Sequence, residues 1–372
     1  MSLTDYKTTK DRNDFLEKKL SLSLPALMEA GQEEGGHIHC ENRVGSITIP
    51  LGVAGPFLIQ GEEVKGEYYI PLATTEGALV ASVNRGAKAC FEKGIITSVQ
   101  RVGVTRGPVL KTNGPKKALL VEKWIWDNMS DLAKKAQESS THIRLMDVVV
   151  KRVGMYIFLR LSFDTDQAMG MNMATIATHT IVEYIASKTK SSVITVAGNF
   201  DIDKKPAWLN SIYGRGFVVQ AESILSSDTV SSVLKTTPKK IEEVWRAKCM
   251  IGSALAGSVG FNAHHANIIA ATYAATGQDL AHVVDGSLGM TIVEVLEDGS
   301  LYISVNLPSV LVGTLGGGTQ LATQKEARSI MKVTTSQALA ELIGAGVLAG
   351  ELSLLASLSA GTLASSHKKL GR

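Results

Sequence analysis

Residues Met250–Gln278 contain no Asp, Glu, Lys or Arg, and this stretch is long enough to span a lipid bilayer. Gly, Ala and Ser dominate it, however, and it includes Asn262, His264, His265 and Asn267. Such polar groups are costly to place in lipid, but they can form hydrogen bonds to a ligand. The stretch therefore predicts a long central helix that is buried inside a protein core.

The pattern of expected strands and helices changes along the rest of the chain. Between residues 108 and 196, strand-like segments alternate with two helical segments, which suits a small βαββαβ unit inserted into a larger pattern. Further long apolar helices are expected at 241–277, 324–348 and 350–365. We predict an α+β protein: a large helical domain built around the long central helix, with an inserted small ferredoxin-like α/β domain. The expected divisions are an N-terminal helical arm (1–39), a discontinuous large domain (40–107 and 197–349), the inserted domain (108–196) and a C-terminal helix with a mobile flap (350–372).

Composition excludes several classes of protein. The net charge of +3 is too small to indicate a nucleic acid or an anionic membrane as partner. The three cysteines, Cys40, Cys90 and Cys249, are unclustered, so they favour neither a disulfide framework nor a zinc site. No charged-then-apolar leader begins the chain. These features fit a reducing, cytoplasmic setting.

The run Ala-Thr-Thr-Glu-Gly-Ala-Leu-Val-Ala-Ser-Val-Asn-Arg-Gly occupies residues 73–86, after a strand expected at Glu67–Ile70. Thr74 or Thr75 is expected to cap a helix here, which would place Glu76 in the first helical turn. The helix dipole favours the charged carboxylate at that position. By itself Glu76 is an ordinary capping residue, and it donates a proton only where its neighbours raise its pKa.

A possible cofactor loop lies at Asp166–Met173, between an expected strand and an expected helix. Gly170 lets backbone N–H groups approach a pyrophosphate at the positive end of that helix. The chain has no G-x-G-x-x-G fingerprint, which disfavours a Rossmann site. On its own this loop is a weak signal, because a methionine stripe at helical spacing usually belongs to a core helix. The glycine-rich segment 313–319 lacks the lysine of a P-loop, so it predicts only backbone contacts.

Two other segments carry charged residues in turns. Asp203, Lys204 and Lys205 lie in a loop expected between a strand at Ser192–Val196 and a helix after Pro206. Adjacent lysines before a proline are usually a solvated loop, and an Asp after a Gly, such as Asp279, is usually a turn residue. A site for metal built on His264 and His265 lacks a carboxylate at ligand spacing, so no metal is expected.

Taken together, these segments resemble the hydroxymethylglutaryl-CoA reductase family, from about Glu41 to His367. The resemblance rests on residues 73–86, Asp201-Ile202-Asp203-Lys204-Lys205-Pro206, Ala168–Met173, Thr276-Gly277-Gln278-Asp279 and Gly316-Gly317-Gly318-Thr319. The Asp-Lys-Lys form is similar to class I, in its soluble archaeal-type branch.

The resemblance implies a role for each matching residue. Glu76 would be the proton donor for an aldehyde intermediate, Lys204 the ammonium that stabilises the oxyanion, Asp279 the group that couples their protonation, and His367 the acid that protonates the departing thiolate. The implied substrate and CoA contacts are Ser82, Asn84, Arg85, Arg106, Asp203, Lys205, Lys248, His264 and Asn267. The implied dinucleotide contacts are Ser140, Gln167, Met169, Gly170, Met171, Asn172 and Gly317.

The resemblance also implies the reaction: two hydride transfers that convert hydroxymethylglutaryl-CoA to mevalonate and free CoA. NADPH is the expected cofactor and NADH the alternative, because Gln167 stands where the family usually has Asp and the Arg often aimed at the ribose phosphate is missing. Ala197 and Asp228 depart from the family as well. Two further readings stay open: an NAD-dependent enzyme that oxidises mevalonate, and a CoA-binding protein whose reductase site has decayed. A homodimer or a dimer of dimers is expected, with the active site at the subunit interface.

Overall fold

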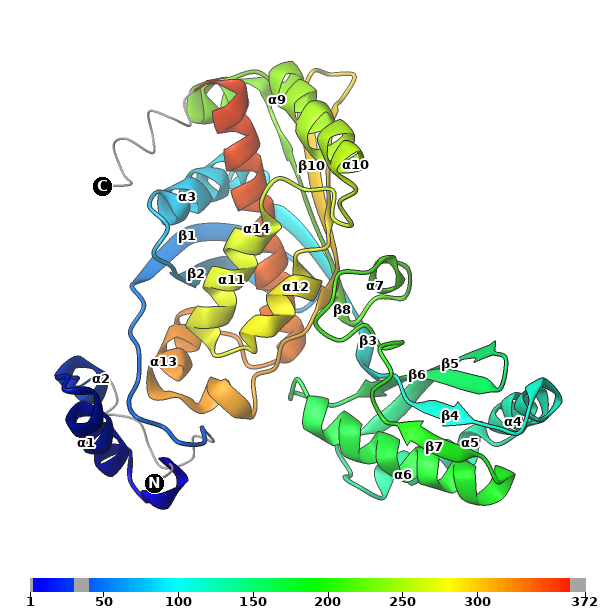
Figure 1. Cartoon of the computed structure of the whole chain (residues 1–372). Coiled ribbons are helices and arrows are strands. Elements are labelled where there is room, and N and C mark those ends of the chain that lie inside the picture. Colours follow the sequence, from blue (N-terminus) through cyan, green and yellow to red (C-terminus); the bar gives the residue numbers. More distant parts are fainter. Residues whose placement is uncertain (1–2, 30–39, 362–372) are drawn as a thin grey trace.

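The computed structural model describes residues 3–29 and 40–361, which form a large unit, a small unit and an N-terminal arm (Figure 1). Each unit has its own hydrophobic core. The arm, α1 (Thr9–Leu20) and α2 (Pro25–Glu29) after a short 3₁₀ turn at Leu3–Asp5, is held by the segment that follows it. For example, Asn13 donates to the carbonyl oxygen of Val44 at 3.0 Å. His367 lies outside the described residues.

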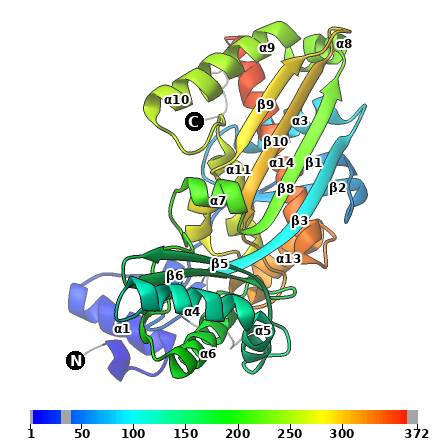
Figure 2. The same ribbon diagram turned by 90° about the vertical axis from the view of Figure 1, so that its right-hand side faces the viewer.

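A curved, mainly antiparallel sheet forms the backbone of the large unit (Figure 2). Its order is β2-β1-β3-β8-β10-β9, and only the β1–β3 pairing is parallel. The last residues of β3 pair with β6 of the small unit, so one strand serves both sheets. The strands are β1 (Leu51–Gln60), β2 (Lys65–Ala73), β3 (Ile95–Arg106), β8 (Gly216–Leu225), β9 (Met290–Val295) and β10 (Leu301–Val310).

Helix α14 (Ser336–Ser359) is the central helix of the large unit, packed among β8, β10, α3 (Leu79–Cys90) and α11 (His265–Thr276). It is long and apolar enough to cross a membrane, but most of it is buried inside the protein, which makes it a core helix. The small residues let neighbours approach closely. A Cβ built on Gly86 of α3 would lie 1.9 Å from the carbonyl oxygen of Ala349.

Shorter helices complete the large unit. They are α7 (Trp208–Tyr213), α8 (Ser227–Thr229), α9 (Pro238–Trp245), α10 (Ser253–Ala256), α12 (Val283–Gly286) and α13 (Ala322–Ile330), with π-helical turns at Val230–Leu234 and Arg246–Gly252 and 3₁₀ turns at Leu280–His282 and Gly317–Gln320.

The small unit has a four-stranded antiparallel sheet and a layer of helices. Its strand order is β7-β4-β6-β5, and every pairing is antiparallel. Helices α4, α5 and α6 pack on this sheet around Leu110, Ile125, Phe163 and Ile181. The elements are β4 (Val109–Lys111), α4 (Pro115–Asp127), α5 (Met129–Gln137), β5 (Arg144–Val153), β6 (Tyr156–Asp164), α6 (Met171–Thr189) and β7 (Ser192–Thr195).

The long central helix expected at Met250–Gln278 is wrong. Gly257 adopts a left-handed conformation (φ 68°) that ends α10, and α11 begins only at His265. In the loop between them, the Asn262 amide donates to the carbonyl oxygens of Ser287 and Gly289. The helices expected at 324–348 and 350–365 are also wrong, because Thr335 caps a new helix that continues through Gly350. The predicted domain boundaries stay predictions.

Candidate active site

The loop that carries Lys204 runs from β7 to α7, as predicted. Asn199, Ile202 and Lys204 all have left-handed backbones (φ 64°, 50° and 58°), which is costly for residues other than glycine. The buried carboxylate of Asp285 compensates by accepting from the backbone N–H groups of Lys204 (3.2 Å) and Lys205 (3.1 Å). These two hydrogen bonds fix the backbone of the loop against the protein interior. The side chain of Lys204 remains half-exposed.

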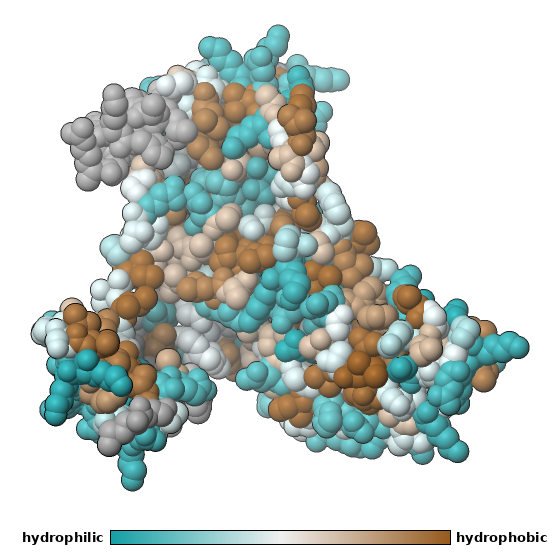
Figure 3. Space-filling view, viewed as in Figure 1, coloured by the Kyte–Doolittle hydropathy of each residue, from teal (hydrophilic) through white to brown (hydrophobic). Residues whose placement is uncertain are grey.

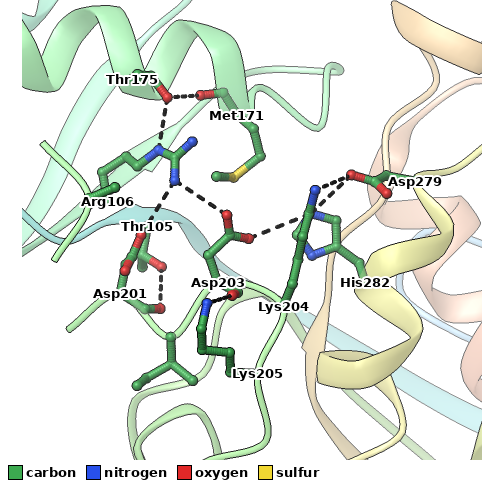
Figure 4. A network of polar contacts seen from close by, with 12 residues as sticks. Thr105, Arg106, Met171, Thr175, Asp201, Asp203, Lys204, Lys205, Asp279 and His282 are labelled. Atoms are coloured by element: carbon green, nitrogen blue, oxygen red, sulfur yellow. Dashed lines mark hydrogen bonds and ion pairs between the residues drawn. The ribbon is translucent and has the colours of Figure 1, made fainter. Parts of the chain in front are cut away.

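Lys204 and Asp279 form an ion pair with 2.8 Å between Nζ and Oδ2 (Figure 4). Asp279 follows α11 and begins the 3₁₀ turn, where its side chain accepts from the N–H of Ala281. Burial alone raises the pKa of this carboxyl. The hydrogen bonds from Lys204 and Ala281 outweigh burial, so the pKa of Asp279 lies below its usual value. Asp279 is thus held ionised beside the ammonium.

Arg106 is the last residue of β3, where that strand passes into the small unit. Its guanidinium donates to Thr175 on α6 (2.8 Å) and lies 3.3 Å from Asp203 and 3.5 Å from Asp201. The ammonium of Lys205 donates to the backbone oxygen of Asp203. These contacts place two cations on either side of the Asp203 segment, close to Lys204 (Figure 4).

Three residues of this cluster were not predicted from the sequence: Arg215, His282 and Asp285. Arg215 is fully buried and donates to Asp203 (2.9 Å) and Asp285 (2.7 Å). His282 lies 3.1 Å from Asp285 through Nδ1. The spacing Asp279-x-x-His282-x-x-Asp285 was a usable signal, since residues three apart in helical turns share a face. Asp203, His282 and Asp285 could together offer ligands to a metal ion, but the guanidinium of Arg215 already occupies that position between the two carboxylates.

Glu76 was predicted to lie in the first turn of α3. It lies instead in the loop before that helix. Thr74 accepts from the N–H of Glu76 in a local turn, and Ala78 has a left-handed backbone (φ 72°), so the helix begins only at Leu79. The carboxylate of Glu76 accepts two bonds from the Asn267 amide, at 2.9 and 3.1 Å. The structure therefore pairs two of the predicted residues from distant segments.

His264 is the residue before α11 and lies beside a cavity of about 510 Å³, which Pro206 and Asn262 also line. Its backbone N–H donates to the buried carboxylate of Glu351. Its Nε2 is buried and has no hydrogen-bond partner among the described residues. That nitrogen is shielded from solvent and lies close to Gly350 of α14, where an added Cβ would be 3.5 Å from it.

Four residues predicted to bind substrate or CoA make structural contacts or lie elsewhere. Ser82 and Arg85 on α3 bond to Ser353 of α14, and Asn84 accepts from the N–H of Gly55 in β1. Lys248 is exposed on the π-helical turn. The described part of the chain does not bring these four to the Lys204 loop.

The predicted cofactor segments lie side by side. Gly170 (φ 82°) precedes α6, where Met171 and Asn172 form the first turn. A β-bridge joins Ala168 to Leu315, which brings the start of the glycine-rich loop beside the segment that leads into this turn. Met169 packs against the core of the small unit.

Gln167 and Ser140 have protein partners. The side-chain oxygen of Gln167 accepts from the N–H of Ser336 (2.7 Å) at the start of α14. The Ser140 hydroxyl accepts from the N–H of His142 at 3.2 Å. Gln167 therefore joins the small unit to the large one, a contact that the sequence did not indicate.

Comparison with known proteins gives a consistent result. A family model described as hydroxymethylglutaryl-coenzyme A reductase matches residues 8–372. The 3-hydroxy-3-methylglutaryl-coenzyme A reductase of Methanothermobacter thermautotrophicus is 46% identical over an alignment of 368 residues, and the match covers 97% of this chain and 92% of that protein. The protein of the same name from Pyrococcus abyssi is 46% identical over 98% of this chain and 92% of its own length.

A solved structure is similar in fold. It is the class II 3-hydroxy-3-methylglutaryl-CoA reductase from Streptococcus pneumoniae bound to NADPH in open conformations, with a TM-score of 0.72 and 18% identity. The match covers 96% of this chain and all of that one. At this identity the likeness concerns the fold alone, a mixed α+β architecture.

Proposed function

This chain belongs to the hydroxymethylglutaryl-coenzyme A reductase family, and from that premise we propose how its own residues perform the reaction. The enzyme is an oxidoreductase of the mevalonate pathway that reduces hydroxymethylglutaryl-CoA with a nicotinamide cofactor. We propose roles for the site residues, the dinucleotide that the enzyme uses, the direction of its reaction and its assembly.

Lys204 is the proposed oxyanion-stabilising group. Hydride addition to the thioester carbonyl places a negative charge on its oxygen, and a fixed ammonium nearby stabilises that charge by about 3 kcal/mol. The observation that carries this proposal is the Lys204–Asp279 pair at 2.8 Å, on a loop whose backbone Asp285 fixes. The loop cannot drift as charge develops, because its strained conformation is held by buried contacts.

Glu76 is the proposed proton donor for the second reduction, and Asn267 holds its carboxyl in place. Asp279 couples the protonation of Lys204 and Glu76. Arg106 and Lys205 would bind the substrate carboxylate, with Asp203 holding Arg106 in place. His264, which lines the cavity, and Asn267, which contacts Glu76, would make further substrate contacts. His367 would protonate the departing thiolate.

The dinucleotide would bind where α6 begins. Gly170 allows a tight turn there, and a Cβ at Gly316 or Gly317 would meet no neighbouring atom within 4 Å, so the surface of the facing loop is open. The N–H groups at the start of α6 suit a pyrophosphate. When bound, the cofactor supplies hydride. We propose NADPH; the structural neighbour from S. pneumoniae is described as bound to NADPH. The small unit, with its ferredoxin-like β7-β4-β6-β5 order, is the proposed dinucleotide-binding domain.

A cytoplasmic setting is proposed as well, supported by the free thiols of Cys40, Cys90 and Cys249. No nucleic acid or membrane partner is proposed.

A spectrophotometric assay of the purified chain, with NADPH and NADH and in both directions, tests this proposal. We expect rapid NADPH oxidation only when hydroxymethylglutaryl-CoA is present. Faster oxidation of mevalonate with NAD would instead indicate the catabolic direction. Lys204→Met should lower kcat by about two decades, whereas the matched control Lys205→Met should mainly raise KM. A near-normal kcat in Lys204→Met would contradict the assignment.

A further inference from the structure

Glu351 is a fully buried glutamate in α14, the core helix of the large unit. Its carboxylate accepts from the backbone N–H groups of Ala263 (2.8 Å) and His264 (2.6 Å), and from the hydroxyl of Thr291 (2.6 Å). Both carboxylate oxygens accept, one of them twice, which suits the ionised form. A buried charge is costly unless hydrogen bonds compensate it, so the carboxylate holds the segment that supplies these donors firmly against α14.

Two of the donors, the N–H groups of Ala263 and His264, lie where α11 begins. The first N–H groups of a helix have no partner within it, and the side chain of the capping residue usually satisfies them. His264 occupies the capping position, but its side chain makes no capping bond. Glu351 supplies the missing cap from another helix, and its negative charge is favourable at the positive end of α11.

Two glycines of α14 let α11 approach closely enough for these bonds. A Cβ on Gly350 would lie 2.6 Å from Cδ1 of Ile268, and a Cβ on Gly346 would lie 3.5 Å from Cγ2 of the same residue. Gly350 directly precedes Glu351 in the chain. The glycine therefore makes room for the first turn of α11, and the next residue binds the backbone where that helix begins.

Asn267 connects the start of α11 to the proposed proton donor. Its backbone N–H donates to the carbonyl oxygen of His264 at 3.0 Å, so it belongs to the turn that Glu351 holds. Its side-chain amide donates to both oxygens of Glu76, at 3.1 and 2.9 Å. Glu76 itself lies in a loop, so the position of its carboxyl depends on this contact.

We propose that Glu351 is a positioning residue, which fixes the first turn of α11 and thereby holds the Asn267 amide against the carboxyl of Glu76. Glu351 is not among the described residues that line the cavity beside His264, so it acts on the site through the helix. Proton transfer requires accurate placement of the donor, and a misplacement of about 1 Å can slow a reaction a hundredfold. The inference rests on the proposed role of Glu76.

Glu351→Gln tests this inference. The amide keeps the size of the side chain, but its nitrogen cannot accept a hydrogen bond, so one N–H group at the start of α11 loses its acceptor. The measurement is kcat for the reduction of free mevaldehyde, the step in which Glu76 would give its proton. We expect kcat to fall by about tenfold or more.

Glu341 supplies the matched control, because it is also fully buried in α14 and its carboxylate also accepts from backbone N–H groups. Those groups belong to the turn between β1 and β2, at the other end of β2 from Glu76: Glu62, Glu63 and Val64. Urea unfolding should show that Glu341→Gln and Glu351→Gln both lose stability. Only Glu351→Gln should slow mevaldehyde reduction, and the control should change kcat by less than about twofold. Equal kinetic losses would make Glu351 a structural residue and overturn the inference.

The double variant of Glu351→Gln and Asn267→Ala tests the route. If Glu351 acts through Asn267, the first substitution adds little once the second is present. We expect less than about a further twofold loss in kcat with mevaldehyde. Losses that multiply in the double variant would overturn the inference, because Glu351 would then act on the site by another route.

Hydrogen exchange of the unmodified enzyme decides the matter if Glu351→Gln does not fold. N–H groups at the start of a helix exchange readily where only water satisfies them. Those of Ala263 and His264 should instead exchange as slowly as the interior of α11, and fast exchange at both would overturn the inference. An unmodified chain that reduces neither hydroxymethylglutaryl-CoA nor mevaldehyde would overturn the proposed function, and the exchange rates would still show whether Glu351 fixes the start of α11.

Discussion

At the scale of single residues, the conformation of the Lys204 loop depends on two buried charged residues, Asp285 and Arg215. Left-handed backbones at Ile202 and Lys204 cost on the order of 1 kcal/mol or more each. Asp285 offsets part of this cost through its two backbone hydrogen bonds, and Arg215 neutralises Asp285 in turn. The position of the proposed catalytic Lys204 therefore depends on Asp285 and Arg215, which are buried beneath its loop.

Glu76→Gln tests the proposed proton donor. The amide keeps the shape of the carboxyl and can still contact Asn267, but it has no proton to give to the aldehyde oxygen. We expect mevalonate formation to slow by about two decades or more while CoA binding survives. Steady-state rates with purified protein measure this. Glu67→Gln, on the exposed face of β2, is the control, and equal rates in both variants would refute the assignment.

We predict that the free energy of unfolding decreases in acid because His265 is buried in its neutral form. Burial lowers its pKa to about 4, below the value of 6.5 expected in the unfolded chain. Between these values the unfolded state binds more protons, so this contribution is complete above about pH 6.5 and is lost as the pH falls toward 4, on the order of 3 kcal/mol in all. Urea unfolding at a series of pH values measures it. His265→Gln should flatten that part of the curve, and an unchanged slope would contradict the prediction.

At the scale of elements, the elements of the small unit were predicted best. The strand at Ser192–Val196 and the helix that begins at Met171 lie where their local signals put them. The long stretch at Met250–Gln278 was misread, because a run of small apolar residues does not reveal that Gly257 turns left-handed and Asn262 bonds across the loop. Such contacts come from distant segments and leave little trace in local spacing.

The same limit applies to the site. Lys204 and Asp279 were found through motifs that lie in loops, and Arg106 through a motif at the end of a strand. Arg215 stands between two glycines just before β8, and no motif in the sequence marks it. Only the fold brings it 2.7 Å from Asp285, a residue seventy positions away.

Gly86→Ala tests the close approach of α3 to α14. The new Cβ would lie 1.9 Å from the backbone oxygen of Ala349, and backbone cannot yield as a side chain can. We expect the free energy of unfolding to fall by about 2 kcal/mol or more. Gly346→Ala is the matched control, because its Cβ would meet only side-chain methyl groups, the nearest on Ile70 at 3.2 Å and on Ile268 at 3.5 Å. Its stability should change by less than about 1 kcal/mol. Similar losses in both would refute the packing argument.

At the scale of the whole molecule, the two units are joined at the site itself. Strand β3 belongs to both sheets and ends at Arg106. The side-chain amide of Gln278, next to Asp279, pairs with both backbone groups of Gly313 in the glycine-rich loop. A change in the placement of the small unit would therefore reach the Lys204–Asp279 pair directly.

Removing residues 366–372 tests the role of His367. The variant should keep its fold and bind dinucleotide, but should reduce hydroxymethylglutaryl-CoA slowly, because the CoA thiolate loses its acid. Free mevaldehyde has no thiolate to protonate and should be reduced at a nearly normal rate. Rates on the two substrates decide this, and equal losses would assign His367 a structural role.

The remaining prediction is that the enzyme is an obligate dimer or a dimer of dimers. Large apolar side chains are exposed on neighbouring segments of the large unit: Ile212 (72%) on α7, Ile251 (62%) on the π-helical turn and Leu255 (88%) on α10. These segments lie along the face turned to the viewer in Figure 2, beside the edge strand β9, and apolar surface is visible over α7 in Figure 3. Burying such a surface favours association. Exposed Lys248 lies in the same π-helical turn, where a second copy could use it.

Leu255→Glu places a charge in the middle of that surface. By light scattering the variant should shift toward monomer, and its activity should fall in parallel, because the proposed site is completed by the partner. Val153→Glu is the control: Val153 is also exposed (63%) but lies at the end of β5 in the small unit, away from α7 and α10. A fully active monomer at the assay concentration would overturn the prediction, since each chain would then hold a complete site of its own.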